Sequence, residues 1–308
     1  MDGLLIINKP KGWTSHDVVA KLRKTLSIQK IGHTGTLDPD ATGVLCACIG
    51  KATRLIEYTS EDEKEYRVIM RLGLTTDTLD AAGKVIKETK DFSVAREVIE
   101  EAFTKFTGRI SQIPPMYSAV KVGGTPLYRL ARQGKEIPRA PREVFIREIR
   151  LLEYSGEFVK FDVLCSRGTY VRTLCADIGD HLGVGAHTYS LERLRSGVFT
   201  IEDALSIEDV ERLHKAGMLS ARVIGTDQMV AWMPSVRVKG LWEEGVRHGR
   251  GLTSESISGI EGNFHRGDKV RLTGSQGELL SIGTALCDSR EALDRNKEKV
   301  FKIEKVLV

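Results

Sequence analysis

One carboxylate, Asp38, stands in a loop rich in glycine, threonine and proline at residues 31–45. The loop runs directly into an apolar segment, residues 43–49. The sequence around Asp38 has neither the cysteine and histidine spacing of a metal site nor the glycine-rich string that cradles phosphates. A single acid on a rigid loop therefore suits a reaction that needs one carboxylate and no cofactor. Taken alone, Asp38 followed by Pro39 is more typical of a turn, because an aspartate hydrogen-bonds the backbone two residues further on.

The elements that must position this loop predict an α+β fold. Residues 64–74 alternate between apolar and polar positions, the pattern of a half-buried strand. Two runs at 144–154 and 158–166 predict a hairpin across the turn between them. Helices and strands do not alternate in regular βαβ units, so we expect a mixed, mostly antiparallel sheet with flanking helices. The predicted helices cover residues 16–26, 93–106 (with Val98 on its apolar stripe) and 169–182.

Two further segments depart from this core. A proline-rich, basic stretch at about 113–143 indicates an insertion, and mobile basic excursions commonly carry function. After residues 229–234 the chain changes to short β-like runs separated by glycine-rich turns, enough for a small β-barrel. We therefore predict one domain over residues 1–230, which carries the Asp38 loop and this insertion, and a small barrel domain over residues 231–308.

Length and composition describe an ordinary globular protein. The 308 residues are 41% hydrophobic and 29% charged, and the length leads us to expect two domains. No apolar run approaches the ~20 residues of a membrane span, and the amino terminus lacks the features of a secretion signal. We expect a cytoplasmic protein that does not contact membranes. The five cysteines are scattered, which favours buried free thiols over a metal site.

The net charge of +4 gives only a mild indication of a polyanionic partner, but the charge is unevenly distributed. Residues 1–34 carry a local charge of +4, and residues 121–150 carry +5. Two basic regions on a nearly neutral chain are typical of a nucleic-acid footprint. From charge alone, a solvated charged face explains them equally well.

The string from Gly32 to Gly43, GHTGTLDPDATG, resembles the signature of the TruB family of tRNA pseudouridine synthases. The similarity continues through residues 8–15, 64–66, 112–121 and 166–172. It implies a stand-alone enzyme that converts uridine to pseudouridine at position 55, in the T-loop of tRNA. The target base would be flipped out of its stack, Asp38 would be the catalytic acid, and neither a cofactor, a metal nor an obligatory protein partner would be required.

The resemblance also implies the roles of the other pocket residues. Tyr66 would stack on the target base and is a candidate acceptor of its C5 proton, whereas a strand tyrosine taken alone is more often a packing residue. Arg172 would pair with the catalytic carboxylate, and without the motif it would be a surface base on a helix. Tyr170 and Leu191 would line the uridine pocket. His33 would press into the T-loop to support the flipped-out base.

The pairing with arginine has a physical purpose. A carboxylate enclosed in a base pocket loses hydration, which raises its pKa, and an arginine within ~4 Å favours the charged form and offsets that penalty. Arginine suits this task better than lysine, because its charge cannot be lost and its fork is rigid. The second acid of the loop, Asp40, lies beyond the proline and is expected to point to solvent.

The remaining implied contacts are with RNA. Lys121, Arg129 and Arg132, in the thumb-like insertion, are expected to contact phosphates without reading sequence. Lys9, in the first motif beside the catalytic loop, is counted with the substrate-binding residues. The tail resembles a PUA domain and is expected to grip the acceptor stem.

The sequence leaves several alternatives open. Asp38 attacks C1′, adds to the base, or assists loss of a sugar proton to give a glycal. A guide-RNA-dependent relative acting on ribosomal RNA, or a non-catalytic RNA-binding or RNA-folding protein, would share much of the chain. The second of these could lose Asp38, Tyr66 or Arg172, and this sequence keeps all three.

Overall fold

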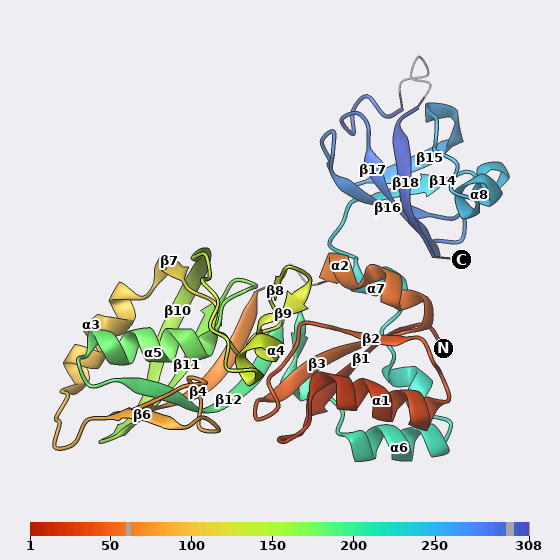
Figure 1. Cartoon of the computed structure of the whole chain (residues 1–308). Helices are drawn as coiled ribbons and strands as arrows, with labels where there is room; N and C mark the ends of the chain where they lie inside the picture. The colour runs from red at the N-terminus through yellow and green to blue at the C-terminus, as the bar shows by residue number, and fades with distance from the viewer. Residues whose placement is uncertain (60–62, 294–298, 308) are drawn as a thin grey trace.

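The computed structural model describes residues 1–59, 63–293 and 299–307 and contains two sheet-bearing parts (Figure 1). The larger part is built on one nine-stranded sheet, in which neighbouring strands run antiparallel except for one parallel pair. This confirms the predicted α+β class with a mixed, mostly antiparallel sheet. In order across the sheet the strands are β1 (Gly3–Lys9), β3 (Thr42–Ile49), β12 (Ala186–Ser196), β4 (Lys64–Leu72), β11 (Phe158–Cys165), β10 (Arg142–Ser155) and β7 (Gly108–Gln112), with β2 (Ile31–Thr34) beside β3 and β13 (Phe199–Thr200) beside β12.

The strands form where the sequence alternates or is continuously apolar. Along β4, Val68, Met70 and Leu72 are all buried, as the two-residue period predicts. The predicted hairpin is also confirmed, since β10 and β11 pair antiparallel up to the contact between Ser155 and Phe158. β12 is the strand that joins the halves of the sheet, because it pairs in parallel with β3 and antiparallel with β4.

Helix α1 (Ser15–Leu26) and helix α5 (Val171–His181) confirm two of the predicted helices. The side chain of Thr14 caps α1 by accepting a hydrogen bond from the amide of Asp17, and the Asp17 carboxylate accepts one from the Thr14 amide. This capping box satisfies donors that the first turn would otherwise leave free. It also fixes the start of α1 at Ser15, the last residue of the string at residues 8–15 that resembles the TruB family.

Helix α3 (Arg96–Lys105) confirms the third helix, but the predicted apolar stripe of Val94, Val98, Ala102 and Phe106 is wrong at Val98. Val98 is 45% exposed, whereas Ile99, Ala102 and Phe103 are buried. The predicted stripe repeated every four residues, and four residues turn a helix through more than one full turn. A buried face needs alternating steps of three and four residues, which Ile99, Ala102 and Phe103 supply.

Between β7 and β10 the chain forms a short excursion with a two-stranded ribbon, β8 (Lys121–Val122) and β9 (Thr125–Pro126), followed by helix α4 (Leu127–Arg132). A second ribbon, β5 (Leu74–Thr76) and β6 (Val85–Glu88), follows β4. In Figure 1, β8, β9 and α4 lie near the middle of the large sheet, where the site described below lies, whereas β6 lies toward its outer end.

The carboxy-terminal part is a five-stranded sheet with helix α8 (Gly240–Arg247) against it. Leu279, Ile282 and Leu307 pack in one apolar cluster with residues of β1 and β3. None of the helices within the described residues is long and apolar enough to cross a membrane. All five cysteines are buried, as predicted. The strand order is β15 (Ile257–Glu261), β14 (Ser235–Val238), β16 (Lys269–Thr273), β17 (Leu279–Ala285) and β18 (Phe301–Val306).

Candidate active site

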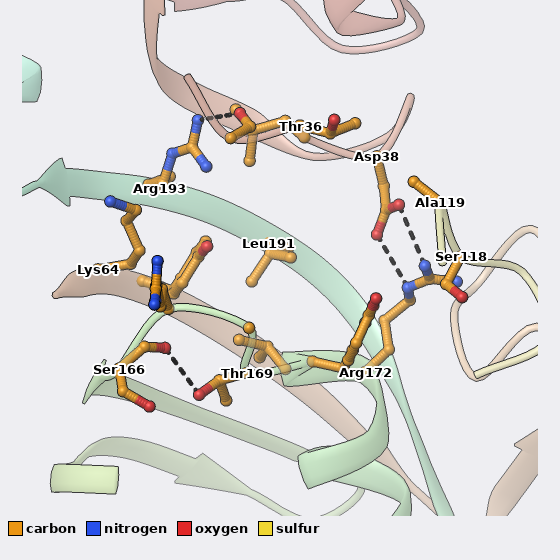
Figure 2. Close-up of a pocket in the computed structure, with 17 residues that line it drawn as sticks. Thr36, Asp38, Lys64, Ser118, Ala119, Ser166, Thr169, Arg172, Leu191 and Arg193 are labelled. Atoms are coloured by element: carbon orange, nitrogen blue, oxygen red, sulfur yellow. Dashed lines mark hydrogen bonds and ion pairs between the residues drawn. The ribbon is translucent and has the colours of Figure 1, made fainter. Parts of the chain in front are cut away.

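A cavity of about 300 Å³ opens in the middle of the large sheet (Figure 2). This volume is at the small end of the range for ligand pockets and suits one flat ring better than an extended ligand. Its walls come from the loop before β3, from β4 and β12, from the basic excursion and from the start of α5. Five of the predicted site residues line it together: Asp38, Tyr66, Tyr170, Arg172 and Leu191.

Asp38 and Arg172 form a two-pronged ion pair at one end of the cavity (Figure 2). Nε of Arg172 lies 2.9 Å from Oδ2 of Asp38, and Nη2 donates to Oδ1 at 3.1 Å. The Asp38 side chain is 40% exposed and that of Arg172 only 7%. The arginine is therefore part of the wall, while the carboxylate keeps an open side toward the cavity.

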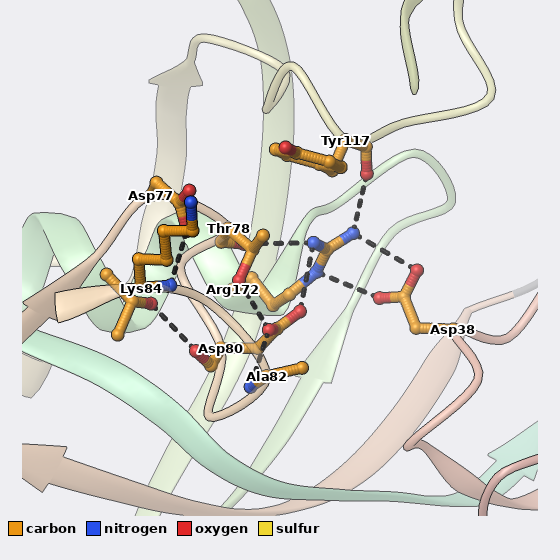
Figure 3. Close-up of polar contacts among 9 residues, drawn as sticks. Asp38, Asp77, Thr78, Asp80, Ala82, Lys84, Tyr117 and Arg172 are labelled. Atoms are coloured by element: carbon orange, nitrogen blue, oxygen red, sulfur yellow. Dashed lines mark hydrogen bonds and ion pairs between the residues drawn. The ribbon is translucent and has the colours of Figure 1, made fainter. Parts of the chain in front are cut away.

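Arg172 uses its remaining N–H groups on two other segments (Figure 3). Nη1 donates to the carbonyl of Thr78 at 3.0 Å and to Oδ2 of Asp80 at 3.2 Å, and Nη2 donates to the carbonyl of Tyr117 at 2.9 Å. All five N–H groups of the guanidinium then have an acceptor. One side chain thus ties the Asp38 loop, the turn after β5 and the basic excursion to α5.

Asp80 is a site residue that the sequence analysis did not identify. Its Oδ1 accepts hydrogen bonds from the Thr78 hydroxyl at 2.6 Å and from the Ala82 amide at 3.1 Å (Figure 3). The carboxylate is therefore fixed before it meets Arg172. The local signal, an aspartate in a turn that ends at Gly83, is the same as that of many structural turns.

The enclosed position of Asp38 raises the pKa of its carboxyl group. Arg172 opposes this effect through its charge and its hydrogen bond, whereas the negative charge of Asp80 adds to it. Loss of hydration is thus the larger effect on this pKa. Arg172 lowers the pKa of Asp38, as expected, but by less than burial raises it.

The string at residues 8–15 anchors the loop that carries Asp38. The Ser15 hydroxyl accepts from the Leu37 amide at 2.9 Å, directly before Asp38. Nζ of Lys9 donates to the carbonyls of Pro10, Trp13 and Pro39, at 2.9, 2.6 and 2.9 Å. The residue is 0% exposed. Lys9 is therefore not placed to contact a substrate, which corrects the sequence-based expectation: its ammonium is consumed by carbonyl groups inside the fold.

Replacing Lys9 by methionine should lower both stability and activity. The variant leaves buried carbonyl groups without their charged donor, which costs about 1–3 kcal/mol for an unsatisfied polar group. Burial lowers the pKa of Lys9 to about 8. Between that pH and the ordinary lysine pKa the unfolded chain binds the extra proton, so the wild-type free energy of unfolding should rise with pH. Urea unfolding at several pH values measures the loss of stability and the pH dependence of the unfolding free energy.

The matched control for Lys9 is Lys11→Met, since Lys11 is exposed two residues further along the same motif. We expect its unfolding free energy to stay within about 0.5 kcal/mol of the wild type. Equal stability of Lys9→Met and Lys11→Met, with the same pH dependence, would show that Lys9 does not hold the loop.

The other predicted RNA-contacting residues lie outside the cavity. Lys121, Arg129 and Arg132 are exposed on the basic excursion. His33 is half-buried in β2 and pairs with Ala47 of β3. Burial lowers the pKa of His33, with the charges of two neighbouring bases acting the same way, so its ring is neutral at pH 7.

Tyr66 and Tyr170 are each influenced by a residue that the motifs did not single out. Burial raises the pKa of the Tyr66 hydroxyl, and the charge of Arg193 opposes this. The side-chain amide of Gln112 accepts from the Tyr170 amide at 3.0 Å and donates to its carbonyl at 3.3 Å. Gln112 is 1% exposed at the end of β7. It lies in the string at residues 112–121, where only the basic residues drew attention.

The three family models that match this chain cover nearly all of it. Residues 23–171 match the amino-terminal domain of the TruB family pseudouridylate synthases, residues 172–231 match the tRNA pseudouridylate synthase B carboxy-terminal domain, and residues 234–307 match the PUA domain. The chain belongs to the TruB family. The Asp38 loop, β4 with Tyr66 and the excursion that carries Tyr117 all fall within the first of these matches.

Relatives of this TruB-family chain are similar over most of their length. A protein named tRNA pseudouridine synthase B from Geobacillus thermodenitrificans is 46% identical over 81% of this chain and 85% of its own length. One of the same name from Clostridium perfringens is 38% identical over 100% of this chain and 99% of its own.

Solved structures extend the similarity to the whole fold. A chain in the crystal structure of a Cbf5–Nop10–Gar1 complex is 32% identical, with a TM-score of 0.79 over 99% of this chain and 85% of that one. A chain in an H/ACA RNP bound to a substrate RNA containing 2′-deoxyuridine is 29% identical, with a TM-score of 0.78 over the same shares. The TruB-family assignment therefore covers the catalytic sheet and the carboxy-terminal sheet together.

Proposed function

We propose that this enzyme converts the uridine at position 55, in the T-loop of tRNA, into pseudouridine. The target nucleotide leaves its stack and enters the cavity, and Asp38 is the catalytic aspartate. The observation that carries the proposal is the half-open Asp38 carboxylate, fixed by Arg172 at the end of a cavity of about 300 Å³. The curated relatives named tRNA pseudouridine synthase B support tRNA as the substrate.

The reaction needs one ionised carboxylate and a pocket that holds the freed base. The C1′–N1 bond breaks, the freed base turns in place, a C1′–C5 bond forms, the C5 proton leaves and N1 takes up a proton. Asp38 serves in its ionised form, either by bonding to C1′, by adding to the base or by taking a sugar proton. Nothing is oxidised and no group enters from outside, so the reaction runs without a cofactor.

The cavity walls support the flipped base. The Tyr66 ring and the Leu191 side chain offer apolar surface on which a pyrimidine can stack. Tyr66 is also the proposed acceptor of the C5 proton. Tyr170 closes the pocket at the start of α5, where Gln112 fixes its backbone. Flipping costs a few kcal/mol, and we propose that His33 helps to offset this cost by supporting the loop that the base has left.

The exposed bases of the excursion provide contacts with the RNA backbone. Replacing Lys121, Arg129 and Arg132 together by glutamine should weaken binding of a T-arm hairpin, and the dependence of log Kd on log salt should become shallower by about 1 for each phosphate that the variant no longer neutralises. The rate of pseudouridine formation at saturating enzyme should change less than about threefold, because none of the three lines the cavity. Titrations at several salt concentrations measure the slope.

A matched control replaces three exposed bases at the far end of the sheet, Lys87, Lys90 and Arg96. We expect this variant to bind with the wild-type affinity and the wild-type salt slope. If both triple variants bind equally well, the excursion does not carry the RNA contacts.

The carboxy-terminal sheet extends the RNA-binding surface. We propose that it grips the acceptor stem, and that the enzyme acts in the cytoplasm without an obligatory protein partner. PUA-domain similarity supports the RNA contact. The similarity to chains of H/ACA complexes favours a second candidate, a guide-dependent enzyme for ribosomal RNA. The identity of 46% to a protein named tRNA pseudouridine synthase B, against 32%, favours the tRNA enzyme.

Purified protein and a T-arm hairpin, a single stem with its loop, suffice to test the proposal. Carbodiimide labelling and primer extension should locate pseudouridine at the position that corresponds to 55 and at no other uridine. The same RNA with cytidine at that position should stay unlabelled. If the hairpin is modified only when a guide RNA is added, the second candidate is correct.

A further inference from the structure

Arg193, in β12, is a buried charge that the roles above do not use. The residue is 1% exposed, yet its side chain lines the cavity. Figure 2 shows Arg193 beyond Leu191, at the end of the cavity opposite the pair of Asp38 and Arg172. Arg172 and Arg193 therefore lie at opposite ends of the site, and Lys64 and Arg167 also line it.

The backbone around the cavity fixes the Arg193 side chain. Nε donates to the carbonyl of Val44 at 2.6 Å, and Nη2 donates to the carbonyl of Gly35 at 3.1 Å. Gly43, between these acceptors in sequence, has a φ of +97°, and a Cβ there would lie 2.2 Å from the carbonyl oxygen of Arg193. Two strands thus meet too closely for any side chain at Gly43, so the backbone of Arg193 lies directly against β3.

No carboxylate within residues 1–59, 63–293 and 299–307 neutralises this charge. In that part of the chain Arg193 has no ion pair with an aspartate or glutamate, whereas Arg172 has two carboxylate partners and Arg195 pairs with Glu65 at 3.1 Å. A buried charge without a counter-ion is costly to keep. A buried guanidinium that is kept without a counter-ion indicates that the site binds or forms a negative charge.

The proposed reaction supplies the missing anion. When the C1′–N1 bond breaks, its electron pair leaves with the base, so uracil carries a negative charge spread over its ring nitrogens and carbonyl oxygens. That charge is cancelled when the electron pair forms the C5–C1′ bond, and the later loss of the C5 proton is balanced by a proton taken up at N1. Arg172 cannot stabilise this anion well, because it already faces the two carboxylates of Asp38 and Asp80.

We infer that Arg193 stabilises the anionic uracil during pseudouridine formation, acting through its charge in the low-dielectric pocket. The inference rests on the proposed function and deepens it. Charges fixed in advance where a transition state develops charge are among the largest contributions to catalysis. The hydrogen bonds to the carbonyls of Val44 and Gly35 hold the Arg193 guanidinium at this end of the cavity.

The test compares two leaving bases in a T-arm hairpin, uridine and 5-fluorouridine, at the target position. Fluorine makes uracil more acidic, so its anion needs less help from the protein. Single-turnover loss of the intact target nucleoside reports the bond-breaking step. Arg193→Gln should slow this step about 100-fold or more with uridine, the cost of one such electrostatic donor. With 5-fluorouridine we expect less than a tenth of that loss.

Arg195→Gln is the matched control, since Arg195 lies two residues along the same strand and pairs with Glu65. It should leave both rates within about threefold of the wild type. Hairpin affinity should be unchanged in all variants. Arg193→Lys keeps the charge and should be faster than Arg193→Gln. If Arg193→Gln does not fold, Arg193→Lys serves instead, with a smaller loss that fluorine again reduces.

Equal fold-losses on uridine and 5-fluorouridine would overturn the inference, and so would a loss explained entirely by weaker RNA binding. A structural role for Arg193 predicts that equality, because a distorted pocket does not respond to the acidity of the base. A wild-type enzyme without activity on the uridine hairpin would overturn the proposed function itself. The two failures are therefore distinct.

Discussion

Asp38→Asn should abolish pseudouridine formation on a T-arm hairpin while leaving RNA affinity within about threefold of the wild type. The amide keeps the shape of the side chain but can neither bond to C1′ nor take a proton. Removing a group that acts directly in the chemical step typically costs about 10⁴-fold or more. Single-turnover assays at saturating enzyme measure the loss, and filter binding measures the affinity.

Asp40→Asn is the control for this variant, because Asp40 is an exposed acid of the same loop. Its rate should stay within about fivefold of the wild type, which allows for a change in local charge. Substantial activity in Asp38→Asn, or a loss of the same size in Asp40→Asn, would contradict the role given to Asp38.

Arg172→Lys should lower the rate about 10³-fold, although it keeps the positive charge. The five N–H groups of Arg172 serve Asp38, Asp80 and the carbonyls of Thr78 and Tyr117. An ammonium has three donors and no planar fork, so at least two acceptors lose their partner. Asp80→Asn, which removes only one of these links, should cost about 10-fold. A mild effect of Arg172→Lys would show that the network does not position Asp38.

The same pair predicts the acidic limb of the pH–rate profile. Burial raises the pKa of Asp38, and Arg172 holds it down. Because the reaction uses the ionised carboxylate, the wild-type rate should fall as the pH drops through this raised pKa. Arg172→Met removes the opposing charge, so the acidic limb of this variant should move to higher pH. An acidic limb at the same pH in both proteins would contradict the coupling of the two residues.

The local features of this protein could be predicted from its sequence. The string around Asp38, the alternation in β4 and the turn between β10 and β11 each lie within a few consecutive residues. Such signals do not depend on the rest of the fold. The five residues that line the cavity together were likewise identified: four lie in the short strings that resemble the TruB family, and the same resemblance implied Leu191.

The residues that sequence reasoning missed act through distant contacts. Asp80 meets Arg172 across 92 positions, and Arg193 reaches Gly35 across 158. Which turn faces α5, and which β12 residue faces β3, is set by strand order and register. The prediction for Lys9 was wrong for the opposite reason. Its type suggested a contact with RNA, but in the fold its ammonium is enclosed by three carbonyl groups. Charge in a sequence says nothing of burial.

The most direct test of the central claim is a crystal structure of the Asp38→Asn enzyme bound to a T-arm hairpin. The account predicts that the target uridine leaves the loop and lies in the cavity against Tyr66 and Leu191, with residue 38 within about 3.5 Å of the reacting sugar or base. A uridine that remains stacked in the loop, or that binds away from Arg172, would contradict it.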